Sequence, residues 1–168
     1  MAMGEYQHLT LSFPPIYDKY SDILILGSFP SVQSRQQEFY YGNPQNRFWT
    51  VLAHLYACEI PTDIEQKKNM LLQSHVAVWD VIQECDIIGS GDSSIKNVTV
   101  NLLNPLLQDS RIRRIYANGR LAANLYQKYT KQETGRDITA LPSTSPANAA
   151  YSVDRLLDAW KVIRDLTE

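Results

Sequence analysis

The strongest constraint on the fold is an uninterrupted apolar run, residues 23–26, that ends abruptly in Gly-Ser-Phe-Pro-Ser at residues 27–31. An apolar run of this length is typical of a parallel strand that is buried on both faces. In sheets of parallel strands, ligands bind beyond the carboxyl ends, where small residues let a ligand reach the backbone. The sequence therefore predicts a ligand site directly after this strand.

Three further apolar runs indicate strands, and amphipathic segments between them indicate helices. We expect strands at residues 76–82, 112–117 and 138–141. We expect one helix that begins at Asn43 and Pro44, helices at residues 62–74 and about 100–108, a helix from Gly119 to about Tyr129, and a last helix after Pro146. Residues 32–41 and the Gly-rich stretch 89–94 are expected to be loops. Strands that alternate with helices build a parallel sheet with helices on both faces. The predicted fold class is α/β, a three-layer α/β/α sandwich around a central four-stranded parallel sheet.

The composition bounds the size and the location of the protein. The 168 residues, 44% of them hydrophobic, are enough for one buried core, so we expect a single domain with residues 1–22 as an extended segment packed on it. A formal charge of -2 gives no basic field over the whole chain, so contacts with nucleic acid would come from a local patch. Cys58 and Cys85 fit neither a disulfide framework nor a metal-ligand set, and we expect both to be reduced thiols in the core. No leader or membrane-length run occurs, which favours a cytoplasmic location. We also expect a monomer that uses no cofactor and no metal.

Common catalytic motifs are missing from the sequence. It has no phosphate-binding Gly-Lys-Ser/Thr, no Gly-x-Gly-x-x-Gly, no His-Glu-x-x-His and no Gly-x-Ser-x-Gly. The three histidines, His8, His54 and His75, are isolated and lie away from the predicted strand ends. Three segments remain at the predicted ligand edge: residues 27–31, Tyr-Tyr-Gly-Asn-Pro-Gln-Asn-Arg-Phe-Trp at 40–49, and Leu-Pro-Ser-Thr-Ser-Pro-Ala-Asn at 141–148.

Taken together and in this order, these segments resemble the uracil-DNA glycosylase superfamily, whose first motif follows the first strand and whose second motif follows the last. Asn-Arg-Phe-Trp resembles the branch that acts on mismatched uracil and thymine. Gly-Ser-Phe-Pro-Ser and Ser-Thr-Ser-Pro-Ala-Asn are more similar to the hypoxanthine (deoxyinosine) DNA glycosylase branch, which we take as the closer match. The resemblance covers most of the chain and implies a base-excision repair enzyme that binds DNA with a damaged base.

By this similarity the catalytic amide is Asn46. Where the uracil-specific branches carry an Asn or Asp that positions the attacking water, this sequence has Phe29, and a His or Asn of the second motif is replaced by Ser143. Breaking an N-glycosidic bond produces an oxocarbenium-like sugar and an anionic base, which require a placed water and stabilised charge. We expect Asn46 to hold that water. The iron–sulfur cysteines of some branches are absent, and no lysine lies in the motifs.

The resemblance also implies a pocket for the base. The backbone N–H groups of Gly27 and Ser28 are suited to bind the departing base, and Tyr41, followed by Phe29, is the expected aromatic platform for a flipped base. Asp80 aligns with the position that reads the base edge, and a carboxylate there would accept a hydrogen bond from N1–H of hypoxanthine. Asp80 also fits a helix cap or a salt bridge, and Tyr41 also fits a core aromatic residue.

Contacts to DNA are expected around the second motif and at the ligand edge. The predicted DNA-binding residues are Ser31, Arg47, Arg120, Ser143, Thr144, Ser145, Pro146 and Asn148. Arg47 and Arg120 equally fit solvated surface charges, and the serine cluster fits an ordinary helix N-terminus.

The predicted function is a monofunctional DNA N-glycosylase that flips a deaminated base, above all hypoxanthine, removes it by hydrolysis and leaves an abasic site. Two alternatives stay open. Asn-Arg-Phe-Trp favours a uracil or G:U/G:T mismatch-specific glycosylase, which Phe29 disfavours. Phe29, Ser143 and the slight acidity favour a catalytically inactive module that binds nucleotides or DNA.

Overall fold

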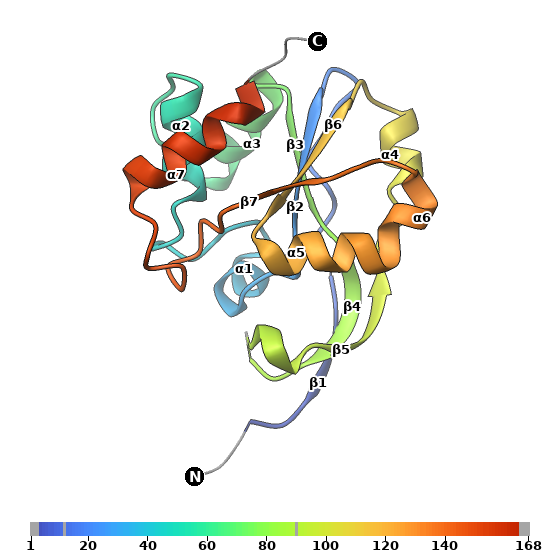
Figure 1. The fold of residues 1–168 in the computed structure, drawn as a ribbon. Helices are drawn as coiled ribbons and strands as arrows, with labels where there is room; N and C mark the ends of the chain where they lie inside the picture. Colours follow the sequence, from blue (N-terminus) through green and yellow to red (C-terminus); the bar gives the residue numbers. More distant parts are fainter. Residues whose placement is uncertain (1–3, 12, 90, 165–168) are drawn as a thin grey trace.

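The centre of the protein is a sheet of four parallel strands in the order β3-β2-β6-β7 (Figure 1). The computed structural model describes residues 4–11, 13–89 and 91–164. The strands are β2 Ile23–Gly27, β3 Val76–Asp80, β6 Arg114–Asn118 and β7 Thr139–Leu141. The predicted four-stranded parallel sheet is confirmed, and its strand ends agree with the predicted runs to within a few residues.

Helices cover both faces of this sheet, because alternate side chains of the buried strand β2 point to opposite sides. Ile23 and Ile25 pack in one core with the helices drawn on the left of Figure 1, which are α2 Phe48–Leu55, α3 Ile64–Gln73 and α7 Val153–Trp160. Leu24 and Leu26 pack in the other core, which is covered by α4 Asn104–Gln108, α5 Arg120–Leu125 and the π-helical continuation Tyr126–Thr130 that leads into α6 Lys131–Thr134. The three-layer α/β/α arrangement is therefore confirmed.

A second, antiparallel sheet was not predicted. Its strands are β1 Gln7–Thr10, β4 Ile82–Ile87 and β5 Lys96–Val100, in the order β1-β4-β5. The predicted strand 76–82 was too long, because β3 ends at Asp80 and the chain then turns into β4 of the other sheet. All five β5 residues are exposed or half-buried, so their apolar pattern is weak and the strand depends on pairing with β4.

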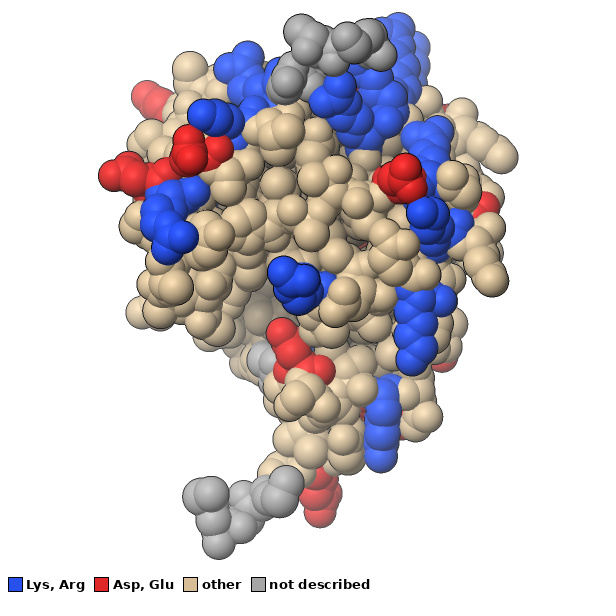
Figure 2. Space-filling view, viewed as in Figure 1, with Lys and Arg blue, Asp and Glu red and all other residues tan. Residues whose placement is uncertain are grey.

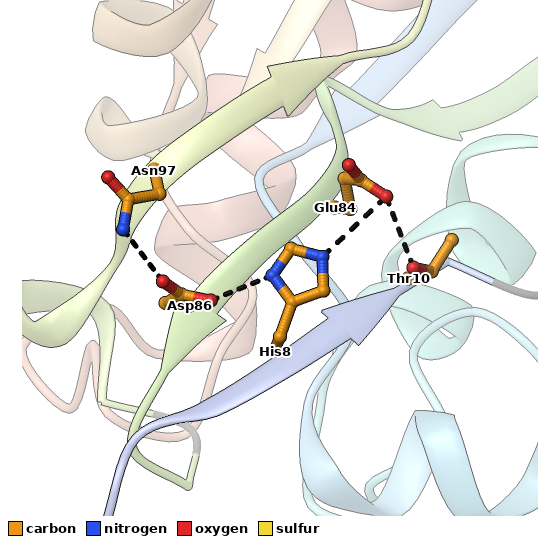
Figure 3. A network of polar contacts seen from close by, with 5 residues as sticks. All are labelled: His8, Thr10, Glu84, Asp86 and Asn97. Carbon is orange, nitrogen blue, oxygen red and sulfur yellow. Dashed lines mark hydrogen bonds and ion pairs between the residues drawn. The ribbon is translucent and has the colours of Figure 1, made fainter.

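A polar network joins the three strands of this second sheet (Figure 3). His8 Nδ1 lies 2.7 Å from Asp86 Oδ1, and its Nε2 lies 3.7 Å from Glu84 Oε2. Thr10 donates to Glu84, and Asn97 donates to Asp86. The hydrogen bond to Asp86 and the two carboxylate charges raise the pKa of His8 above its usual value. The sequence predicted only an extended segment before β2. Part of that segment, β1, is a strand of the second sheet.

The segment between β2 and α2 also differs from the prediction. The predicted loop 32–41 contains a short helix, α1 Val32–Gln37. The predicted helix start at Asn43 and Pro44 is wrong, since α2 begins at Phe48. Asn43 Oδ1 instead accepts a hydrogen bond of 2.9 Å from Gln45 N–H, which closes a local turn.

Smaller corrections concern single residues. Cys85 is buried as predicted, but Cys58 is exposed just after α2, so its assignment to the core was wrong. The last helix begins at Val153 with Ser152 as its N-cap, later in the chain than the predicted start after Pro146. Ser90, part of the predicted polar loop, lies outside the described residues.

Candidate active site

The carboxyl ends of the parallel strands meet at a cavity of about 440 Å³, a volume typical of small-molecule sites. Its wall contains residues from the ends of β2, β3 and β6, from the segment before α2 and from the loop after β7. Among them are Gly27, Ser28, Phe29, Tyr41, Asn46, Asp80, Asn118, Arg120, Ser143 and Thr144. The segments that the sequence placed at one edge therefore do line one cavity.

Asp80 ends β3 and contributes a buried carboxyl to the cavity wall. The residue is 4% exposed, and its Oδ2 atom has no hydrogen-bond partner among the described residues. Burial raises the pKa of Asp80 to about 7, because the loss of hydration penalises the charged form. No ion pair or helix cap of this side chain occurs in the described part of the chain, so neither alternative role is supported. Because Asp80 lines the cavity and its Oδ2 has no partner in the described chain, this atom is available to a ligand group.

Glycine at position 27 makes room for this carboxyl. Gly27 lies opposite Asp80 in the sheet, and a Cβ atom at position 27 would overlap Asp80 Oδ1. Val81 and Ile82 donate backbone hydrogen bonds of 2.8 and 3.1 Å to the carbonyls of Gly27 and Ser28. Because peptide units are planar and trans, the N–H groups that follow these carbonyls point away from the β3–β4 turn. The turn is thereby held in one orientation.

Tyr41 is a strained aromatic residue at the cavity. Its φ of +52° is unfavourable for a side chain of this size, and such strain is characteristic of functional sites. Its ring stacks on the buried Phe48 with centroids 3.9 Å apart, and Trp49 donates a hydrogen bond of 3.1 Å to its carbonyl. Its buried Oη atom makes no well-formed hydrogen bond among the described residues, and burial raises the pKa of Tyr41 against a weak opposing interaction with the Asn118 side chain. Phe48 and Trp49 are core residues that support this ring.

Phe29 also lies in the cavity wall, at the turn after β2. Its ring is partly buried against the core on the α4 and α5 side of the sheet. The guanidinium of Arg35 lies 5.7 Å from its ring centroid. Phe29 thus offers an apolar surface to the cavity.

Asn46 is fixed by a chain of hydrogen bonds that crosses the site. Its Oδ1 accepts from Phe48 N–H at 3.0 Å and from the Thr144 hydroxyl at 2.7 Å. Thr144 Oγ1 in turn accepts from Asn118 Nδ2 at 3.0 Å, and Asn118 Oδ1 accepts from Thr144 N–H at 3.0 Å. Since both lone pairs of Oδ1 are engaged, the Nδ2 group is left for a water or a ligand. Asn46 lies just before α2 and not in its first turn.

Thr144 has a different place from the one that the sequence predicted. It is fully buried, so its side chain positions Asn46 and is not presented to DNA. Asn118 was not among the predicted site residues. It is the last residue of the third parallel strand, and the expectation that strand ends line the site would have identified it.

Arg47 ties the loop after β7 to the start of α2. Its guanidinium donates to the carbonyls of Ser145 at 2.7 Å and Asn148 at 3.1 Å, and also to those of Thr144 and Tyr151. These bonds engage most of its N–H donors, which favours a positioning role over the predicted phosphate contact or a solvated charge.

The remaining predicted DNA-binding residues lie around the cavity mouth. Ser143 Oγ accepts from Ser145 N–H at 3.1 Å, and Asn148 Nδ2 donates to the Ser143 carbonyl at 3.0 Å, so this loop is ordered by its own polar groups. Ser31 caps α1 by accepting from Ser34 N–H. Arg120 is exposed at the start of α5, and Pro146 is half-buried in the loop. Figure 2 shows a largely uncharged face that has basic and acidic side chains close together near its centre, and further basic side chains along its upper, left-hand and right-hand rims.

No helix in the described ranges is long and apolar enough to cross a membrane. No group of three or more His, Cys, Asp or Glu side chains in that part of the chain is arranged to hold a metal ion.

Comparisons with known proteins agree with the geometry of this site. A family model described as the uracil DNA glycosylase superfamily matches residues 14–167. A hypoxanthine DNA glycosylase from Methanosarcina acetivorans is 34% identical over 153 residues, which cover 90% of this chain and 95% of that protein. One with the same name from Methanosarcina barkeri is 29% identical over 139 residues, covering 81% and 86%. The solution NMR structure of a candidate uracil DNA glycosylase from Methanosarcina acetivorans superposes with a TM-score of 0.77 at 33% identity, covering 90% of this chain and 93% of that one.

Proposed function

Because the chain belongs to the uracil DNA glycosylase superfamily, we propose that it is a monofunctional DNA N-glycosylase that removes hypoxanthine and leaves an abasic site. Two relatives that align with most of its length carry the name hypoxanthine DNA glycosylase. The observation that carries the proposal is the buried, unpartnered carboxyl of Asp80, which faces the same cavity as the fixed amide of Asn46. One group suits recognition of a base, and the other suits the placement of a water.

The proposed chemistry is hydrolysis through an oxocarbenium-like sugar. Such a transition state needs little nucleophilic strength, so a water in the correct place is sufficient. Asn46 would hold this water by donating from Nδ2, which leaves the water a lone pair for attack on C1′. The bonds from Thr144 and Phe48 fix the amide before the substrate arrives, so no reorganisation is required during the reaction.

The base would be held after it has left the DNA stack. Tyr41 is supported from one side by Phe48, which leaves its other side as a stacking surface for the flipped base. Phe29 adds an apolar wall that suits a purine, which is larger than uracil. The backbone N–H groups that follow the Gly27 and Ser28 carbonyls would bind the departing base, and Asp80 would read its edge.

The DNA backbone would be held by the rim of the cavity. The loop of residues 143–148 offers Ser143 and Ser145 at the mouth, with Asn148 later in the same loop, and Ser31 and Arg120 also line the cavity. This is a small footprint for a chain with a net charge of -2, so we infer weak binding by a monomer that works on DNA in the cytoplasm. No lysine lies in the wall of this cavity, so the sugar would not form a Schiff base with the protein.

A second candidate is the removal of uracil or mismatched thymine, which the name of the family and the Asn-Arg-Phe-Trp segment favour. The test is incubation with duplexes that carry hypoxanthine, uracil, xanthine or mismatched thymine, followed by alkaline cleavage. We expect strand cleavage to be fastest for hypoxanthine, and Asn46→Ala to lower its rate by about 2–4 kcal/mol of transition-state stabilisation. Faster release of uracil would favour the second candidate, and release of no base would favour a binding module.

A further inference from the structure

Two of the buried polar atoms without a protein partner belong to residues in the cavity wall, where β2 and β3 end side by side. They are Asp80 Oδ2, which has no hydrogen-bond partner among the described residues, and Tyr41 Oη, which makes no well-formed hydrogen bond there although the Asn118 side chain interacts with it weakly. Both side chains approach Gly27, since a Cβ atom there would overlap Asp80 Oδ1 and lie 3.2 Å from Tyr41 Oη. Unpaired buried polar groups cost free energy, so this pair is arranged to meet a ligand in the cavity.

The surroundings of Asp80 are unsuited to a negative charge. The titratable or charged residues that face it or share its cavity are Tyr40 and Tyr41 from the segment before α2, Arg120 from α5, and Asp92 from the short helix Asp92–Ser94. Of these, Arg120 and Asp92 are exposed, and the tyrosine hydroxyls carry no positive charge. Burial raises the pKa of the carboxyl, and no cation in the described chain offsets that effect.

We propose that Asp80 reads hypoxanthine as a neutral carboxylic acid, whose O–H donates to O6 and whose other oxygen accepts from N1–H. This inference rests on the proposed function and assigns the protonation state in which the base-reading residue works. A carboxylic acid presents a donor beside an acceptor, which matches the N1–H and C6=O edge of the purine. An ionised carboxylate presents only acceptors and would oppose O6. The expectation of a carboxylate at this position is thereby revised.

The neutral form also suits the departure of the base. When the C1′–N9 bond breaks, its electron pair stays on the purine, and water forms the new C1′–O bond and releases a proton to the solvent. The purine therefore gains negative charge, which a hydrogen bond from Asp80 to O6 would stabilise. A second negative charge on buried Asp80 would repel the leaving purine in a poorly solvated cavity.

Discrimination against adenine is then assigned to the backbone. A carboxylic acid can carry its proton on either oxygen, so it can match the adenine edge as well as the hypoxanthine edge. A backbone N–H, in contrast, can only donate a hydrogen bond. A contact from Ser28 N–H to O6 would face the C6 amino group of adenine, which leaves two donors opposed in a buried place.

The test compares single-turnover excision of hypoxanthine by the wild type and Asp80→Asn between pH 5.5 and pH 9. An amide offers the same donor and acceptor but does not ionise. We expect the wild-type rate constant to fall about tenfold per pH unit above pH 7, since only the neutral fraction acts. At pH 6 we expect the rate constant of Asp80→Asn to lie within about tenfold of the wild-type value. Above pH 6 it should not change with pH. Ionisation of the substrate itself would affect both proteins, so their difference isolates Asp80.

A wild-type rate constant that stays level or rises above pH 7 overturns the proposal, and so does an Asp80→Asn protein as slow as Asp80→Ala at pH 6. A wild-type protein that releases no hypoxanthine at any pH overturns the proposed function together with this inference, which is a distinct result. If the variants do not fold, ¹³C NMR of the wild-type Asp80 carboxyl, with a non-cleavable deoxyinosine analogue in DNA, decides the question. A neutral carboxyl at pH 7 supports the proposal, and an ionised one overturns it.

Discussion

The burial of Asp80 predicts how the stability of the protein depends on pH, independently of catalysis. Burial raises the pKa of Asp80 from 3.8 to about 7 in the folded chain. The folded state then binds the proton more tightly than the unfolded state, so folding stability is lost as pH rises from about 4 to about 7 and changes no further above that range. At 1.36 kcal/mol per pH unit, the whole interval corresponds to about 4 kcal/mol, of which about 2.5 kcal/mol falls between pH 5 and pH 8.

Asp80→Asn removes this titration while it keeps the shape of the side chain. Urea unfolding of both proteins at pH 5 and pH 8 measures the effect, because every other titrating group is common to the two chains. We expect Asp80→Asn to gain about 2.5 kcal/mol relative to the wild type when the pH is raised from 5 to 8. A matched control is Asp158→Asn, since that carboxyl on α7 is 81% exposed. Its stability should follow the wild-type pH dependence.

Parallel pH dependences of the wild type and Asp80→Asn would refute the reasoning. They would mean that the Asp80 carboxyl ionises in the folded chain as readily as in the unfolded one. The neutral form would then have no structural cause, and the proposal for base reading would lose its physical basis.

Three further predictions concern contacts in the described chain. Thr144→Val should lower single-turnover excision about tenfold, because Asn46 loses a hydrogen bond, whereas Thr144→Ser should retain most of the rate; equal rates for the two variants would contradict the positioning role. Arg47→Lys should lower the unfolding free energy in urea by about 2 kcal/mol and leave the salt dependence of DNA binding unchanged; a shallower salt slope would restore Arg47 as a phosphate ligand. The raised pKa of His8 stabilises the fold when the ring is protonated, so this contribution is present below about pH 6.5 and lost as pH rises through the folded pKa. Thermal unfolding of His8→Gln should therefore lack a gain that the wild type shows between pH 8 and pH 6.

The sequence alone determined the parallel sheet and the edge where the site lies. The run at residues 23–26, followed by glycine and serine, is a local signal, because burial on both faces requires a continuous apolar strand. The same reasoning brought residues 143–148 to this edge and put Asp80 in the next strand, whose end it placed two residues too late. Pairing of parallel strands then makes these segments neighbours without further information.

Only the tertiary structure decided what several of these residues contact. Thr144 and Arg47 look like phosphate ligands in the sequence, but Thr144 is buried against Asn46, and Arg47 binds carbonyls far along the chain. The second sheet was missed for the same reason, since the exposed strand β5 is stabilised by its partner β4 more than by its own pattern.

The protonation state of Asp80 is also a property that only the tertiary structure decides. The amino-acid sequence shows a carboxyl at a strand end, where an ionised side chain is the ordinary expectation. Its pKa depends on how much water and which charges surround it, and both are properties of the packed cavity. The amino-acid sequence therefore determines which residue types line the site, but the fold determines the charge of Asp80 when a base binds.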